Sequence, residues 1–159
     1  MLAEGEVKRV WERMVEAEVR SFYFADLASQ FTQRKQIITG ISFFLSSGAA
    51  ASLIAKAPTL LPILLSVAVA LASAYSIAVG LDRRIKTLTK LHCEWNQLSS
   101  DYEHLWNHWG DDDAARILNE LIKRGRDASE IGTEMPYNEQ LLEKWENVVY
   151  SRFKQAATA

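Results

Sequence analysis

The sequence predicts an all-α fold: an integral membrane helical hairpin with two transmembrane helices, which carries long cytoplasmic helical arms. Two observations predict it. Among 159 residues with 18 basic and 20 acidic side chains, Lys56 is the only charged residue between positions 37 and 81. On both sides of this apolar stretch, hydrophobic residues recur at the three- and four-residue spacing of amphipathic helices. We therefore expect the arms to pack as a helix bundle or a coiled coil.

Residues 1–36 are predicted to form an N-terminal amphipathic cytoplasmic helix that continues into the first span. No proline interrupts this segment, and its apolar residues at helical spacing are Val7, Val10, Trp11, Met14, Ala17 and Phe22. The run Phe22-Tyr23-Phe24 has two interpretations. It lies at the level of the lipid headgroups, as aromatic belts do, or it packs against the other arm.

Residues 37–81 are predicted to form the two-span transmembrane hairpin. The charge-free runs 37–55 and 57–81 contain 19 and 25 residues, whereas a bilayer core needs roughly 20 helical residues. Lys56, Pro58 and Pro62 interrupt the apolar pattern and predict a tight turn. The alternative is a hairpin that is buried inside a soluble protein.

Basic residues next to the spans predict the orientation, because they are retained on the cytoplasmic side of a membrane. Arg34 and Lys35 precede the first span, and Arg83, Arg84, Lys86 and Lys90 follow the second. We therefore expect a multi-pass protein of the inner (cytoplasmic) membrane, embedded in the lipid bilayer, with both termini in the cytoplasm.

Small residues within the spans predict close packing of helices, because small side chains let helix backbones approach each other in lipid. The second span has two rows at four-residue spacing, Ser66, Ala70, Ala74, Ala78 and Ala68, Ala72, Ser76, Gly80. One row would pack the hairpin and the other would contact a second copy, which predicts a homo-oligomer. The candidate pore-lining or helix-packing residues are Ser42, Ser46, Ala49, Lys56, Ser66, Ala70, Ser73, Ala74 and Gly80.

The serines among these candidates define a mildly polar face with two interpretations. In an assembly the face would line water, or each hydroxyl simply bonds back to its own helix. Neither span contains Asp, Glu, His or Arg, and such residues mark proton relays and cation filters. An acidic-ring cation channel is therefore disfavoured.

Residues 82–125 are predicted to form a cytoplasmic heptad helix followed by a short helix. The heptad seam consists of Leu88, Leu91, Trp95, Leu98, Tyr102, Leu105 and Trp109. It predicts either a coiled coil between copies or packing against the N-terminal helix of the same copy, and the bulky tryptophans favour the second arrangement or a mixed bundle. Gly110 and the three aspartates after it are expected to end this helix and to cap the next one, which stops at Gly125.

Residues 126–159 are predicted to form a polar linker and a C-terminal amphipathic helix over 138–155. This helix would dock on the bundle or hold a partner. Its expected buried residues are Leu141, Leu142, Trp145, Val148, Val149 and Phe153.

No pattern of catalytic residues is present. The sequence has no glycine-rich phosphate loop, nucleophile elbow, zincin pair or CxxC, and the single Cys93 excludes a disulfide framework. His104 and His108 lack a third ligand at metal-binding spacing, and His92 is distant from both. We expect no enzyme, no metal and no cofactor, and a pI of about 5.9 disfavours nucleic acid as a partner.

Several residue patterns together resemble the SLATT family of bacterial two-span proteins. They are Arg20-Ser21-Phe22-Tyr23-Phe24 and Arg34-Lys35 before the first span, and Leu91-His92-Cys93-Glu94-Trp95 with Asp101-Tyr102-Glu103-His104-Leu105 after the second. The resemblance covers about residues 11–124. It implies a membrane effector that forms a pore in an antiphage or nucleotide-signalled cell-suicide system, with a signalling enzyme or sensor that is encoded separately. A passive membrane anchor or scaffold that recruits a partner through its arms is the alternative.

Overall fold

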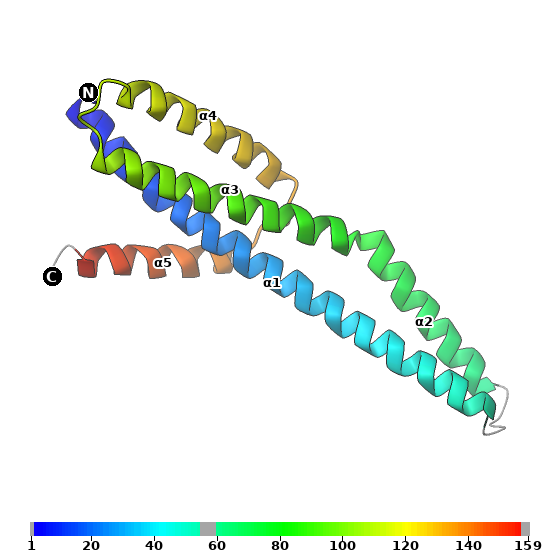
Figure 1. Cartoon of the computed structure of the whole chain (residues 1–159). Coiled ribbons are helices and arrows are strands. Elements are labelled where there is room, and N and C mark those ends of the chain that lie inside the picture. Colours follow the sequence, from blue (N-terminus) through cyan, green and yellow to red (C-terminus); the bar gives the residue numbers. More distant parts are fainter. Residues whose placement is uncertain (1, 55–59, 157–159) are drawn as a thin grey trace. The chain divides into compact units, whose positions relative to one another are not determined.

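The computed structural model describes residues 2–54 and 60–156, and these residues are almost entirely helical. They contain no β-strand, which confirms the all-α prediction. The five helices are α1 Glu4–Ile54, α2 Leu60–Val79, α3 Leu81–Asn107, α4 Ala114–Thr133 and α5 Glu139–Ala156 (Figure 1).

The chain divides into two compact units, and α1 and α3 contribute to both. The arm bundle comprises Met1–Leu27 and Thr87–Ala159, and the apolar unit comprises Ala28–Lys86. The first half of α1 therefore belongs to the same unit as the C-terminal helix α5.

Helix α1 is a single helix of 51 residues, as the absence of an internal proline predicts. Its first turn is acidic, and the Glu6 carboxylate accepts a hydrogen bond from the Ala3 backbone N–H at 2.9 Å. Such a contact satisfies one of the donors that a helix start leaves unpaired.

The core of the arm bundle contains a row of buried residues on each of its long helices. Val10, Met14, Ala17, Ser21 and Phe24 of α1 are buried at alternating spacings of three and four residues. The heptad residues of α3 are buried in the same unit. His92 of α3 contacts Ser21 of α1, with Nδ1 lying 3.1 Å from the hydroxyl and 3.0 Å from the backbone carbonyl.

Helix α4 corrects a sequence prediction, because it does not stop at Gly125 but runs on to Thr133. Ala128 is buried and Ile131 is half-buried beyond that glycine, so tertiary contacts outweigh the low helix propensity of one glycine. The predicted start at Ala114 is correct. Asp113 occupies the N-cap position without a side-chain cap bond, and its carboxylate pairs instead with Arg116 at 3.3 Å.

Helix α5 follows a short connection and begins one residue later than predicted. The Asn138 side-chain oxygen accepts a hydrogen bond from the Leu141 N–H at 3.1 Å, which caps the helix. Tyr23 of α1 holds the connection in place: its hydroxyl donates to the Pro136 carbonyl at 3.4 Å and accepts from the Asn138 N–H at 3.0 Å. Val148 was expected in the core but is 39% exposed.

Gly80 separates α2 from α3 and has a φ of +62°. This left-handed conformation is disfavoured for residues with a Cβ atom. The sequence prediction placed Gly80 in a packing row of one continuous span. The structure instead assigns it to the break between two helices, where its lack of a side chain is a backbone requirement.

We expect Gly80→Ala to lower the free energy of unfolding by about 1 to 2 kcal/mol, which is the usual penalty for a left-handed alanine. A Cβ added at this position would meet no atom within 4 Å, so the loss is conformational and Gly80→Asn should recover part of it. Thermal denaturation in detergent, followed by circular dichroism, measures the effect.

Gly40→Ala is the matched control for this prediction. Gly40 lies inside α1 of the same unit, also with open space around a Cβ, so alanine there should be neutral or stabilising by about 0.5 to 1 kcal/mol. Equal losses for the two variants would contradict a special role for the backbone of Gly80.

Candidate functional site

One helical stretch among the described residues is long and apolar enough to cross a membrane. It lies within Leu60–Asn107, and its most apolar window has a mean hydropathy of 2.1. Only 6% of that window is buried, whereas the core helix of a soluble protein would be mostly buried. The chain itself therefore does not cover the surface of this helix.

Large hydrophobic side chains are exposed throughout the apolar unit. Helix α2 contributes Leu60, Leu61, Ile63, Leu64, Val67, Leu71, Tyr75 and Ile77. The second half of α1 adds Ile37, Ile41, Phe43 and Phe44, of which Phe44 is 78% exposed. Apolar surface of this extent marks a membrane or protein contact.

The two small-residue rows of α2 lie in different environments. Ala68, Ala72 and Ser76 are half-buried, whereas Ser66, Ala70, Ala74 and Ala78 are exposed. Ser73, a candidate that belongs to neither row, is exposed as well. A Cβ at Gly48 of α1 would lie 3.7 Å from Leu65 Cδ1 of α2, so the two helices pack closely at this point. The row of Ala68, Ala72 and Ser76 thus belongs to packing within the unit, and the row that begins at Ser66 is left for another contact.

The predicted polar face of α1 is divided. Ser42 is half-buried and Ser46 is exposed. The side chain of Ala49 lies outside the described residues, as do Lys56 and Pro58 of the predicted turn. Pro62, the last residue of that predicted turn, is buried in the first turn of α2.

The serine hydroxyls of the apolar unit bond back to their own helices. Ser46 donates to the Ser42 carbonyl at 2.7 Å, Ser47 to the Phe43 carbonyl at 3.0 Å and Ser66 to the Pro62 carbonyl at 2.8 Å. This is the local alternative that the sequence left open. Each hydroxyl oxygen keeps its acceptor capacity, so the bonds do not prevent contact with water.

Charged side chains gather where the apolar segment ends. Lys35 of α1 forms an ion pair with Asp82 of α3. The guanidinium groups of Arg34 and Arg84 lie 5.5 and 6.0 Å from the ring centroid of Phe31, which is 6% exposed. This end of the apolar unit therefore presents cations that suit lipid phosphates.

The heptad seam is buried within a single chain. Leu88, Leu91, Trp95, Leu98, Tyr102 and Leu105 are 0–4% exposed, so the arrangement within one copy accounts for the pattern. Trp109 is an error of the sequence prediction: it is 43% exposed and lies beyond the end of α3. The helix ends two residues earlier, and the backbone carbonyl of Trp109 accepts a hydrogen bond from Leu2 N–H at 3.0 Å.

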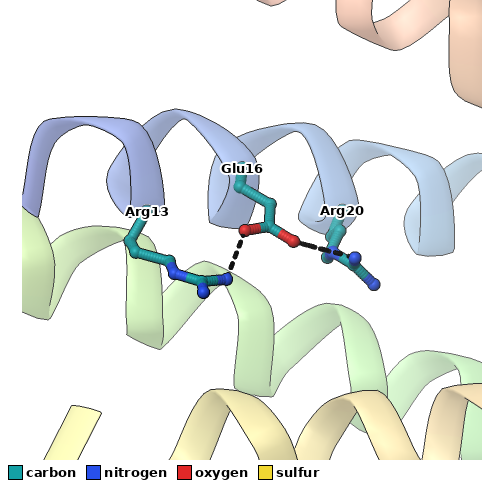
Figure 2. A network of polar contacts seen from close by, with 3 residues as sticks. All are labelled: Arg13, Glu16 and Arg20. Carbon is teal, nitrogen blue, oxygen red and sulfur yellow. Dashed lines mark hydrogen bonds and ion pairs between the residues drawn. The ribbon is translucent and has the colours of Figure 1, made fainter. Parts of the chain in front are cut away.

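A network of polar contacts runs along α1 beside this core. Figure 2 shows Glu16 between two arginines, with its oxygens 2.7 Å from Arg13 and 2.8 Å from Arg20. The Arg20 guanidinium also lies 5.0 Å from the ring centroid of Trp95. Burial raises the pKa of the nearby Tyr102 to about 12.

Helix α5 docks on α1 through aromatic and charged contacts. Trp145 stacks on Phe22 with ring centroids 4.9 Å apart, and its indole N–H donates to Asp26 at 3.2 Å. Val149 is fully buried against Val15 and Val19. The aromatic run of α1 therefore packs inside the bundle, since Tyr23 and Phe24 are each 5% exposed, and the headgroup-belt interpretation is wrong for these two.

The described residues contain no group of three or more His, Cys, Asp or Glu side chains placed to hold a metal ion. His104 and His108 stack on each other at 4.3 Å. The sequence patterns do not single out Arg13 or Glu16, and they single out Arg20 only within the run that resembles the SLATT family. Their i, i+3 and i+4 charge spacing beside an apolar row was the signal that could have found them.

Comparison with known families, with curated proteins and with solved structures finds no match to this chain.

Proposed function

We propose that this chain is a membrane effector that oligomerises in a lipid bilayer and permeabilises it. The single observation that carries the proposal is an apolar helix of spanning length whose surface the chain leaves uncovered. Lipid is the environment in which such a surface is stable.

The proposed topology has two spans, the second half of α1 and α2, in an inner membrane with both termini cytoplasmic. Exposed apolar residues on both helices support it. The basic residues that flank the apolar segment in the sequence, Arg34 and Lys35 before it and Arg83 and Arg84 after it, support it as well. The exposed row of Ser66, Ala70 and Ala74 is the proposed contact between copies.

The resemblance to SLATT proteins motivates the biological setting of the proposal. In that setting a separately encoded nucleotide-signalling enzyme or sensor triggers the pore in a bacterial antiphage or cell-suicide response. The self-contained arm bundle is the part of the chain that would receive the signal.

A membrane scaffold is the second candidate, and a specific observation favours it. The serine hydroxyls already bond within their helices, and the heptad seam is already buried in one chain. Neither feature then requires an aqueous lumen or a partner copy. A scaffold would use the surface of the arm bundle to recruit a cytoplasmic protein.

Induced expression with a membrane-potential dye tests the effector. We expect depolarisation and growth arrest, and we expect the double variant Ser66→Leu, Ser73→Leu to reduce the leak at equal protein level, because it removes two exposed hydroxyls and adds bulk in a shared lumen.

Ser47→Leu is the matched control, since Ser47 is exposed and makes the same backbone contact but lies outside the predicted polar face. A control that blocks the leak as strongly as the double variant would contradict the proposed lumen. Membrane-inserted protein that never depolarises cells, and that has no conductance in reconstituted bilayers, would contradict the effector and favour the membrane scaffold.

A further inference from the structure

A small cavity of about 250 Å³ lies within the arm bundle, where three helices meet. Helix α1 contributes Arg13 and Glu16 to its lining, α3 contributes Trp95 and Tyr102, and α4 contributes Arg126 and Ser129. The cavity is separate from the apolar unit, and neither proposed function uses it.

The lining is rich in hydrogen-bond donors. Trp95 is 4% exposed, and its indole nitrogen is buried without a hydrogen-bond partner among the described residues. Buried donors are nearly always paired, so an unpaired one points to a missing acceptor. The Tyr102 hydroxyl remains protonated at neutral pH and is a second donor, and the Ser129 hydroxyl is a third.

The charge of the lining is positive. Arg13 and Arg126 both line the cavity, and Arg20 adjoins it over the Trp95 ring. Glu16 is the only acidic side chain of the lining, and its two carboxylate oxygens are already occupied by Arg13 and Arg20 (Figure 2). Arg126 is an exposed residue, and no ion pair among the described residues involves it.

We propose that this cavity binds the phosphate group of a small anion, either free inorganic phosphate or a phosphate monoester. A tetrahedral oxyanion offers several acceptors in different directions, which matches guanidinium, indole, phenol and hydroxyl donors that come from three helices. The volume of the cavity lies below the usual range of pockets that bind whole organic ligands, so the cavity has room for a phosphate group but not for a larger chemical group.

A neighbouring groove offers space for the organic part of a monoester. Its volume is about 750 Å³, it shares Glu16 and Ser129 with the cavity, and aromatic residues of α1 and α5 line it. Among them are Trp11, Tyr23 and Tyr150. An aromatic monoester should therefore bind more tightly than inorganic phosphate if both spaces are used.

The test is a titration of the full-length chain in detergent with sodium phosphate, against sodium chloride at matched ionic strength. Tryptophan fluorescence and the midpoint of thermal unfolding are the readouts, because a ligand that binds only the folded state raises that midpoint. We expect saturable binding. Phenyl phosphate is the second probe and phenol its uncharged control.

Variants assign the donors. Arg126→Gln should weaken phosphate binding about tenfold or more, because it removes a charged donor. Trp95→Phe keeps an aromatic ring and should weaken binding less. Glu16→Gln should strengthen it, since one competing negative charge disappears.

Arg116→Gln is the matched control, because Arg116 lies on the same helix, 64% exposed and already paired with Asp113 and Glu120. It should leave binding unchanged. Absence of saturable binding would overturn the proposal. Equal losses of phosphate affinity for Arg126→Gln and Arg116→Gln would also overturn it, and the cavity would then be a water-filled space. Binding of phosphate and phenyl phosphate with equal affinity would restrict the ligand to a free phosphate group. These outcomes do not depend on whether the protein permeabilises membranes.

Discussion

Replacing Leu98 by alanine is expected to remove about 2 to 5 kcal/mol from the free energy of unfolding of the arm bundle, the usual cost of truncating a fully buried leucine. Leu98 is 0% exposed at the middle of the heptad seam. The truncation leaves a void that the neighbouring helices cannot close without moving their own side chains. Urea denaturation in detergent, followed by tryptophan fluorescence, measures the loss.

Trp109→Ala is the matched control for the seam. Trp109 follows the same spacing but is 43% exposed, and a surface substitution usually changes stability by less than about 0.5 kcal/mol. If truncating Trp109 were as costly as truncating Leu98, Trp109 would pack in a way that the structure does not describe.

Protein concentration separates packing within one copy from packing between copies. The loss at Leu98 should be the same at every protein concentration, because the seam is buried inside one chain. A seam shared between copies would make the unfolding midpoint depend on concentration. Such a dependence, weakened by Leu98→Ala, would contradict intrachain packing.

Periodicity predicted the helices well because it reports a local property. The absence of proline predicted the length of α1. The heptad spacing predicted seven seam residues, and six of them are buried. Spacing alone cannot say where a pattern ends, so it places Trp109 in the seam although α3 ends at Asn107. It also cannot say which partner covers a seam, since one apolar face suits an intrachain or an interchain neighbour equally well.

Single glycines were the least predictable positions. Gly125 was expected to end a helix and lies inside one, whereas Gly80 was expected inside a span and forms a break. Both errors have one physical origin. A glycine tolerates helical and left-handed backbone equally, so contacts distant in sequence decide which one it adopts.

The candidate phosphate cavity could not be predicted from any single segment. Its lining comes from residues that are up to 116 positions apart in the sequence, from Arg13 to Ser129. The missing information was the register in which α1, α3 and α4 face each other. The exposed apolar surface, in contrast, was foreseeable, because a 45-residue window with one charge has too few polar groups to cover it.

Tyr102 predicts a loss of stability at high pH. Burial is the main cause that raises its pKa from 10.0 to about 12, with smaller opposing effects of Arg13 and Arg124 and a reinforcing effect of Glu16. Between pH 10 and pH 12 the unfolded chain loses the phenolic proton while the folded protein retains it. The free energy of unfolding should therefore fall with rising pH across this window, by about 2 kcal/mol from this residue.

Tyr102→Phe isolates this contribution, because phenylalanine has no proton to lose. All other titratable groups are common to the two proteins, so the difference between the two denaturation curves belongs to Tyr102. We expect that difference to be constant below pH 9 and to change between pH 10 and 12 in favour of the phenylalanine variant. Urea denaturation at a series of alkaline pH values measures it. Parallel pH profiles for the two proteins would mean that the phenol ionises as readily in the bundle as in the unfolded chain, and would contradict the burial of this hydroxyl in the folded protein.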